Sequence, residues 1–329
     1  MDRPLWLDRS FFKAHGHGND YLVFQEGGSW PVTPETVQAV CHRQRGVGSD
    51  GIVALLAPEG GSGVVAHEGR SFREPGAADG PGAGGSPHAV HAPPFRLRMF
   101  NPDGSEFERS GNGLRVLGSY LFYRGWVREG ESFPVEVGGD RLGMEILGRE
   151  EGGLLQVGVD MGEARFGLAA VGGREGGEGS GGILPGPHGE PLDIQPLSVG
   201  NPHCVVFRDQ LAEGDLLSLG PFLTKHPVFP RGVNVQLARR TGEREIQILI
   251  WERGVGRTTA SGTSSCAVAA AFVRRGLISP GKVVVEMEGG RFRVLVSPEG
   301  SVRLEGPVQP VMTGSLADGL LRALGEGPG

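Results

Sequence analysis

Short apolar segments separated by turn residues run along most of this chain, and they predict a structure rich in strands. Near the N-terminus, a turn at Gly16 to Asp20 joins two strand-like segments between Lys13 and Phe24. Further strands are expected at Phe95 to Phe100, Phe133 to Val137, Leu155 to Val159, Leu197 to Phe207 with a break at Gly200-Asn201-Pro202, Val233 to Leu237, Ile246 to Trp251, Val283 to Met287, Phe292 to Val296 and Val302 to Leu304.

Helices are predicted at few places. Pro34 to Arg43 is expected to be a helix with Thr33 as its N-cap. A second helix follows from the spacing of Leu114, Leu117, Leu121 and Phe122. The stretch Ala267 to Phe272 is apolar on nearly every side, which is typical of a helix enclosed by a sheet. The C-terminal segment Met312 to Leu324 should add a final strand or helix. The order of elements predicts an α+β fold.

Two stretches of the chain repeat one design. In each, a strand is followed by a polar segment, a Ser-Gly pair and a helix that ends in Arg-Gly. The landmarks of the second copy follow those of the first at one offset, so that Ser261 corresponds to Ser110 (261 − 110 = 151) and Arg275 to Arg124. An internal duplication is the simplest explanation. We therefore expect two pseudo-symmetric domains, each a sheet wrapped around a central helix, with the active site in the cleft between them.

The predicted halves are residues 1–127 and 128–310. The C-terminal residues 311–329 are expected to pack on the first half. The 59 glycines and 24 prolines are many for a globular chain, and they are densest in two segments, at about residues 58–94 and 171–191. These segments contain few apolar residues, so they are predicted to be flexible insertions. The first holds His67, His88 and His91, which fit solvated loop histidines better than metal ligands.

Charge and cysteine content narrow the class of function. The net charge is −6, from 32 basic and 38 acidic residues, and no long basic run is present. This charge pattern argues against nucleic acid and membranes as partners, and a small-molecule substrate fits better. The N-terminus lacks a signal-peptide pattern and no run approaches the roughly 20 apolar residues of a membrane span, so the cytoplasm is the expected location. Cys41, Cys204 and Cys266 are too scattered for disulfides or a metal site and are expected to be buried free thiols.

The two Ser-Gly helix starts are the strongest candidates for chemistry. A helix N-terminus has about four unpaired N–H groups and carries roughly half a positive charge, which suits a carboxylate or a developing oxyanion. Each serine taken alone is more simply explained as an N-cap, whereas their matched contexts favour a shared site. Polar residues around them add to the candidates. Arg253 could bind a carboxylate, Glu252 could accept an ammonium, and Asn201 and His203 lie at the strand break.

The segments HGHGND (His15 to Asp20), FNPDGSEFERSGNGLR (Phe100 to Arg115), GNPHCVV (Gly200 to Val206), GVNVQ (Gly232 to Gln236) and ERGVGRTTASGTSSCA (Glu252 to Ala267) occur in one order that resembles the diaminopimelate epimerase family. The resemblance covers most of the chain outside the two insertions. It implies two pseudo-symmetric halves, no metal or other cofactor and, usually, a homodimer. It also implies epimerisation of LL-diaminopimelate to meso-diaminopimelate, a precursor of lysine and peptidoglycan.

In that family one cysteine thiolate removes the α-proton and a second cysteine thiol delivers a proton to the opposite face. The resemblance implies that the catalytic group here comprises Ser110, Ser261, His203 and Glu252. By motif position, the implied substrate contacts are Asn19, Asn101, Gly111, Asn112, Asn201, Asn234, Glu252, Arg253, Gly262 and Thr263.

Both cysteine positions hold serine in this chain. A serine hydroxyl is several pKa units less acidic than a thiol and needs a neighbouring base, for which His203 and Glu252 are the candidates. Cys266 and Cys204 should face away from the cleft and are not obvious replacements. Two alternatives to a slow epimerase stay open. One is a catalytically inactive protein that binds diaminopimelate, and the other is a related amino-acid isomerase or dehydratase.

Overall fold

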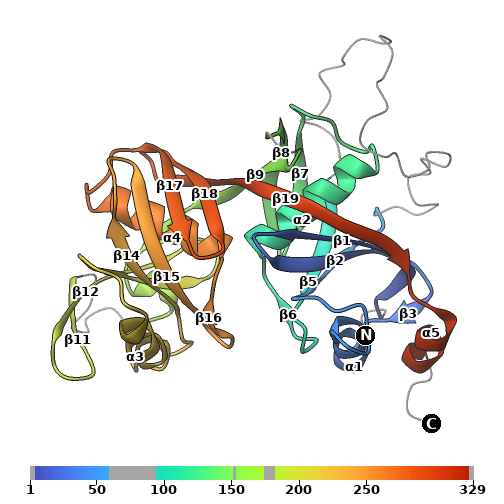
Figure 1. Cartoon of the computed structure of the whole chain (residues 1–329), viewed down its shortest axis with the longest axis horizontal. Helices are drawn as coiled ribbons and strands as arrows, with labels where there is room; N and C mark the ends of the chain where they lie inside the picture. Colours follow the sequence, from blue (N-terminus) through green and yellow to red (C-terminus); the bar gives the residue numbers. More distant parts are fainter. Residues whose placement is uncertain (1–3, 59–93, 151–152, 174–181, 326–329) are drawn as a thin grey trace. The chain divides into compact units, whose positions relative to one another are not determined.

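The computed structural model describes residues 4–58, 94–150, 153–173 and 182–325, and it divides the chain into two compact units. The first unit comprises Met1–Val159 and Pro307–Gly329, and the second comprises Asp160–Gly306. Strands β9 (Leu155–Glu163) and β19 (Ser301–Ser315) run through the two boundaries and pair with each other (Figure 1).

The first unit is a mixed sheet with three helices. Its strands are β1 (Trp6–Gly16), β2 (Asn19–Glu26), β3 (Trp30–Pro31), β4 (Ile52–Leu55), β5 (Phe95–Phe100), β6 (Glu106–Phe107), β7 (Ser132–Val137) and β8 (Asp140–Arg149), and its helices are α1 (Pro34–Cys41), α2 (Gly111–Tyr123) and α5 (Asp318–Gly325). The sheet order is β19-β1-β2-β4-β5-β7-β8-β9. The pairs β2–β4 and β5–β7 are parallel, and the pairs β1–β2, β4–β5, β7–β8 and β8–β9 are antiparallel.

The second unit repeats this topology. Its strands are β10 (Arg165–Phe166), β11 (Gly182–Pro185), β12 (Pro191–Ser198), β13 (Pro202–Phe207), β14 (Asn234–Arg240), β15 (Glu245–Glu252), β16 (Gly256–Thr258), β17 (Gly281–Met287) and β18 (Gly290–Val296), and its helices are α3 (Glu213–Thr224), α4 (Gly262–Arg274) and the short 3₁₀ helix η2 (Ala169–Val171). Here β13–β14 and β15–β17 are the parallel pairs, in an order β12-β13-β14-β15-β17-β18-β19. The shared sequence of parallel and antiparallel pairs supports the predicted duplication.

A central helix lies against several strands of the sheet in each unit. Residues 111–121 of α2 and residues 262–272 of α4 are buried without a break. Each helix begins after an N-cap serine, and each is followed by a glycine in the left-handed region, Gly125 (φ 71°) and Gly276 (φ 68°). A glycine at this position ends a helix without steric strain. The predicted α+β class, with a sheet around one helix in each half, is confirmed.

Two sequence predictions need correction. The first unit extends to residue 159, not 127, because β7, β8 and the start of β9 complete the sheet that covers α2. The segment predicted as a flexible insertion at 171–191 contains β11, which pairs with β12 from Gly182 to Pro185. Residues 174–181 of this segment, and nearly all of the insertion at 58–94 with its three histidines, lie outside the described residues.

Other predictions concern thiols, metal ions and membranes. All three cysteines are free and buried, as expected. Among residues 4–58, 94–150, 153–173 and 182–325, no group of acidic, histidine or cysteine side chains is arranged to hold a metal ion. None of the helices in these ranges is long and apolar enough to cross a bilayer.

Candidate functional site in two matched halves

Ser110 is the N-cap of α2. Its backbone is extended (φ −127°, ψ 125°) and its Oγ accepts a hydrogen bond from Gly113 N at 3.1 Å. The residue is half-buried, whereas Gly111 and Asn112 behind it are buried. Because Gly111 carries no side chain, the N–H groups at the start of the first turn can be approached closely by a ligand.

Asn112, the second residue of α2, is connected to the β1–β2 hairpin by its side chain. Its Nδ2 donates to both the backbone oxygen and the Oδ1 of Asn19, at 2.5 and 2.8 Å. Arg115 Nη2 donates to Asn112 Oδ1 at 2.8 Å, and Asn19 Nδ2 donates to Asp50 Oδ2 at 3.0 Å. The Arg115 guanidinium can only donate and the Asp50 carboxylate can only accept. Because these two groups end the series of hydrogen bonds, they fix the orientation of the Asn112 and Asn19 amides.

The hairpin that carries Asn19 is held by ionic contacts. Asp20, which is buried, is bound by Lys13 Nζ at 2.9 Å and by Arg43 Nη2 at 2.9 Å. Burial raises the pKa of the Asp20 carboxyl, but the hydrogen bonds from Arg43 and Lys13 outweigh it and the net pKa is lowered. Gly16 in the same hairpin leaves room for the side chains of Asn112 and Arg115, which a Cβ there would meet.

Asn101 is less closely connected to this group. Its Nδ2 donates to Ser105 Oγ at 3.0 Å and its backbone N–H donates to Ser105 O at 2.9 Å, both within the β5–β6 turn. The first unit therefore brings together Ser110, Gly111, Asn112 and Asn19. Asn101 follows β5 in the turn before α2, with its amide directed to its own loop.

Ser261 begins α4 in the same way as Ser110 begins α2. Its backbone is extended (φ −153°, ψ 122°) and its Oγ accepts from Ser264 N at 3.4 Å. Thr263 is the second residue of α4, the position that Asn112 has in α2. Asn201, from the turn before β13, donates through Nδ2 to Thr263 Oγ1 at 3.4 Å. In both units, then, an asparagine at or just before the start of a strand contacts the second residue of the central helix.

His203 is fully buried and both of its ring nitrogens have partners. Nε2 lies 2.8 Å from Asn201 Oδ1, and Nδ1 lies 3.0 Å from Gln236 Nε2. Burial lowers the pKa of the imidazole to about 3, and the charge of Arg253 acts in the same direction. This ring is therefore neutral at physiological pH and has its hydrogen bonds with amides.

Asn234, Glu252 and Arg253 lie around the end of β15. Asn234 Nδ2 donates to Pro202 O at 3.0 Å, and its Oδ1 accepts from the backbone N–H of Arg253 at 2.9 Å. Arg253 Nη1 donates to Arg231 O at 2.9 Å, so in this structure the guanidinium binds a carbonyl. Glu252 is half-buried at the last position of β15.

The groups around Ser110 and around Ser261 form two half-sites, and the sequence patterns do not identify three residues that belong to them. Arg115 orients Asn112, Asp50 orients Asn19, and Gln236 contacts both His203 and Ser264. Gln236 stands in the GVNVQ segment, but its type alone does not distinguish it from a surface residue. Burial is what makes it notable, because Gln236 is 0 % exposed.

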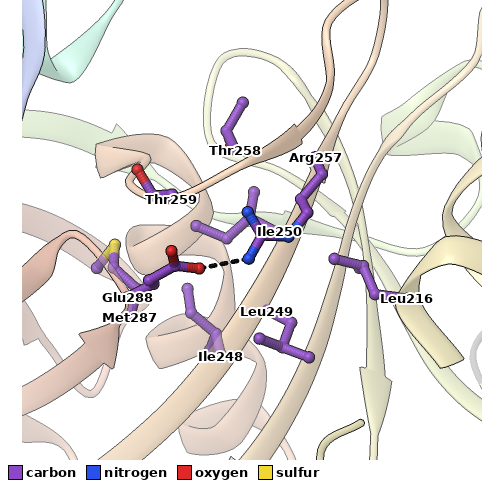
Figure 2. Close-up of a pocket in the computed structure, with 9 residues that line it drawn as sticks. All are labelled: Leu216, Ile248, Leu249, Ile250, Arg257, Thr258, Thr259, Met287 and Glu288. Atoms are coloured by element: carbon purple, nitrogen blue, oxygen red, sulfur yellow. Dashed lines mark hydrogen bonds and ion pairs between the residues drawn. The ribbon is translucent and has the colours of Figure 1, made fainter. Parts of the chain in front are cut away.

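A small pocket adjoins the segment that leads to Ser261. Arg257 in β16 lies beside it and makes ion pairs with Glu213 (2.8 Å) and Glu288 (2.5 Å). Figure 2 shows the Arg257–Glu288 contact beside the aliphatic side chains of Ile248 and Ile250. Five of the nine residues that line the pocket are apolar. The two ion pairs of Arg257 connect β16 to α3 and to the turn after β17.

The sequence profile described as diaminopimelate epimerase matches residues 11–167 and 197–315 of this chain. Among curated proteins, "Diaminopimelate epimerase" of Pelotomaculum thermopropionicum is 35 % identical over 315 residues, covering 92 % of this chain and 97 % of the relative. "Diaminopimelate epimerase 2" of Nostoc sp. is 33 % identical over 319 residues, covering 93 % and 95 %. The chain belongs to the diaminopimelate epimerase family.

Two solved structures have the same fold as this chain. A hydroxyproline epimerase from Agrobacterium vitis superposes with a TM-score of 0.63 at 14 % identity, covering 94 % of this chain and 92 % of that one. A structure described as a predicted epimerase from Pseudomonas aeruginosa gives a TM-score of 0.58 at 18 % identity, covering 94 % and 99 %. Diaminopimelate epimerases are isomerases, and the titles of both structural neighbours also describe epimerases.

Proposed function

We propose that this member of the diaminopimelate epimerase family interconverts LL- and meso-diaminopimelate by proton transfer at the α-carbon, slowly and without a cofactor. We further propose that Ser110 and Ser261 act on one substrate, as the family resemblance implies. The observation that carries this proposal is the matched construction of the two helix N-termini, each with a capping hydroxyl and an asparagine bound to the second helical residue.

The first-turn N–H groups of α2 and α4 suit the substrate carboxylate. As the α-proton leaves, negative charge spreads onto that carboxylate, and donors already aimed at it stabilise the charge without reorganising. The amide of Asn19 is held by Asp50 and Asn112, so its orientation does not depend on the ligand. Binding and charge stabilisation are thus provided by groups that the serine substitutions leave unchanged.

The serines limit the rate at one step. A hydroxyl can deliver a proton to a carbanion, but it must be deprotonated before it can remove one. Each pKa unit that separates serine from cysteine raises the free energy of the reactive anion by about 1.4 kcal/mol. His203 has both ring nitrogens bonded to amides, so it is poorly suited to assist as a base.

The same observation favours a second candidate function, which is binding of diaminopimelate without turnover. In that case Ser110 and Ser261 serve only as N-caps, and the amides and helix N-termini hold the ligand. The two candidates predict equal binding and differ only in proton exchange.

One experiment separates them. Deuterium incorporation at the α-carbon of LL-diaminopimelate in heavy water is compared for the native protein, the Ser110→Cys/Ser261→Cys variant and the Ser110→Ala/Ser261→Ala variant. Exchange by the native protein above the alanine variant supports the slow epimerase. Exchange only by the cysteine variant, with calorimetric binding by the native protein, supports the binding function. Absence of binding in all three proteins, each shown to be folded, contradicts both.

The finer assignments follow the family resemblance. We propose that the protein works as a homodimer in the cytoplasm, at the step before meso-diaminopimelate enters lysine and peptidoglycan synthesis. Sedimentation velocity of the native chain tests the dimer. A racemase or dehydratase reaction on hydroxyproline stereoisomers is the remaining alternative, and loss of water from those compounds would reveal it.

A further inference from the structure

A ring of hydrogen bonds lies behind the start of α4. It begins at Thr263 Oγ1, passes through the amide of Asn201, the imidazole of His203 and the amide of Gln236, and returns to the helix at Ser264 Oγ. His203, Gln236 and Ser264 are each 0 % exposed. Because this ring contacts two consecutive residues of the first turn, any change in its hydrogen-bond directions reaches the helix N-terminus.

A neutral imidazole has one donor and one acceptor, so the ring can be directed in two ways. In the first, Gln236 Nε2 donates to Ser264 Oγ and to His203 Nδ1, His203 Nε2–H donates to Asn201 Oδ1, and Asn201 Nδ2 donates to Thr263. In the second, every direction is reversed and both side-chain amides are turned over. In both directions every contact of the ring joins a donor to an acceptor. The two directions differ in which atom of a side-chain amide has no hydrogen-bond partner, and that atom decides between them.

The leftover atom belongs to Gln236. In the first direction this is Oε1, which is buried and has no hydrogen-bond partner among the described residues. In the second direction the NH₂ group would take that position, leaving two buried N–H donors without acceptors. Buried N–H groups without a partner are rarer in proteins than under-satisfied carbonyl oxygens. The first direction, with the proton on Nε2 of His203, is therefore the stable one.

We infer that Gln236 is a positioning residue that holds His203 in its Nε2–H tautomer, and that His203 in turn orients the Asn201 amide and transfers no proton during the reaction. This inference rests on the proposed function only for its link to the substrate. One N–H of Asn201 Nδ2 points to Thr263 and the other is then available to a ligand carboxylate. In a reversed ring Asn201 would present its amide oxygen to Thr263. Its side chain would then no longer offer the same N–H to a ligand carboxylate.

The direction of the ring can be measured without a substrate. Long-range ¹H–¹⁵N spectra of protein labelled at histidine report which ring nitrogen carries the proton, and the His203→Asn variant identifies the His203 signals. We expect the native protein to show the Nε2–H pattern, unchanged between about pH 5 and pH 8. An Nδ1–H pattern, or titration of His203 within that range, would overturn the inference.

The role of Gln236 is tested by Gln236→Glu. A carboxylate at this position can only accept, so Nδ1 must become the donor and the tautomer should reverse. The matched control is Gln195→Glu, a change of the same kind at a buried glutamine of the second unit whose amide binds Pro196 O. The control should keep the Nε2–H pattern. A Gln236→Glu variant that is folded and retains the native tautomer would contradict the assigned role.

Gln236→Met provides a second test if Gln236→Glu does not fold. It removes the donor to Nδ1, so the two tautomers should become mixed. The affinity for diaminopimelate, measured by calorimetry, should fall about tenfold in any variant with altered tautomer, because one charge-assisted hydrogen bond is lost. If the native protein binds no diaminopimelate, the proposed function fails, but the tautomer pattern still decides the role of Gln236.

Discussion

Ser110 and Ser261 occupy positions where a hydroxyl and a thiol would behave very differently. Each Oγ accepts the N–H of the third helical residue and lies at the positive end of a buried helix. That environment stabilises a thiolate, because the pKa of a thiol is near enough to neutrality for a helix N-terminus to lower it into the working range. It stabilises an alkoxide as well, but the pKa of a serine hydroxyl is several units above that of a thiol, so the alkoxide remains much rarer.

We expect a cysteine at either position to show this effect directly. In the variants Ser110→Cys and Ser261→Cys the thiol pKa should fall below its usual value of about 8.5, by roughly one unit or more. The pH dependence of the alkylation rate with iodoacetamide measures it, since Cys41, Cys204 and Cys266 are buried and should react slowly. Ser218→Cys, at an exposed position inside α3, is the matched control and should have an ordinary pKa. Equal pKa values in all three variants would contradict the assigned electrostatics.

His203 makes stability depend on pH in a defined direction. Its folded pKa is lowered to about 3, whereas the unfolded chain should titrate near 6.5. Between these values the unfolded state binds more protons, so the free energy of unfolding rises with pH, by at most about 1.4 kcal/mol per pH unit from this residue. Stability is therefore full above about pH 6.5 and is lost as the pH falls below it.

Urea unfolding at about pH 7 and pH 5 checks this linkage. The His203→Asn variant should be less stable than the native protein at pH 7, because its hydrogen bonds are altered. The difference between the two proteins should shrink at pH 5, by about 1–2 kcal/mol, since the variant has no buried imidazole to protonate on unfolding. A difference that stays constant with pH would show that His203 is charged or accessible in the folded protein.

At the scale of elements, the sequence predicts best where local chemistry and burial agree. The helices α2 and α4 follow from apolar runs bounded by serine and glycine, and strand β5 follows from the alternation of apolar and arginine side chains. Helix α3 was not predicted, because it lacks a side-chain N-cap and contains Gly214, Gly220 and Pro221. Its formation depends on packing of Leu216, Leu219 and Leu223 in the core of the second unit, which local sequence does not reveal.

The two glycines of α3 have opposite surroundings. Gly214 has no atom within 4 Å of an added Cβ, whereas at Gly220 the Cβ would lie 2.5 Å from Trp251 Cγ. We expect Gly214→Ala to stabilise the protein by about 0.5–1 kcal/mol, because alanine favours the helix and restricts the unfolded chain. Gly220→Ala should destabilise it by about 1–3 kcal/mol through overpacking against the indole.

Urea denaturation of the two alanine variants measures both effects in one helix. Each variant serves as the control for the other, since the helix-propensity gain is common to both. Similar shifts of the midpoint in the two variants would mean that the contact of Gly220 with Trp251 does not limit packing.

At the scale of the whole molecule, the sequence predicts the duplication but not how the chain closes each sheet. The offset between Ser110 and Ser261 is visible in the printed residues, as are the two Arg-Gly helix ends. The unit boundary was predicted too early because β7 and β8 carry no signal that assigns them to the first helix rather than the second. Pairings between distant strands, such as β1 with β19, depend on the complete sheet and not on any local pattern.

The first unit should therefore depend on the C-terminal end of the chain, whereas the second should not. Strand β1 pairs with β19 from Ser10↔Ser315 to His15↔Gln309, and Leu316 and Leu324 join the core beneath α1. The second unit is continuous and has its own apolar core around α3 and β12 to β14.

We expect a chain that ends at Gly306 to lose the cooperative unfolding transition of the first unit and to keep that of the second. The reason is that β1 loses its neighbour along this ladder, a loss comparable with the whole stability of a domain, about 5–15 kcal/mol. Differential scanning calorimetry and amide signals assigned to α2 and α4 distinguish the two units. A chain that ends at Ala317 retains β19 and Leu316 and loses only α5, so it should preserve both transitions. Native-like α2 signals in the chain that ends at Gly306 would mean that the first sheet folds without β19.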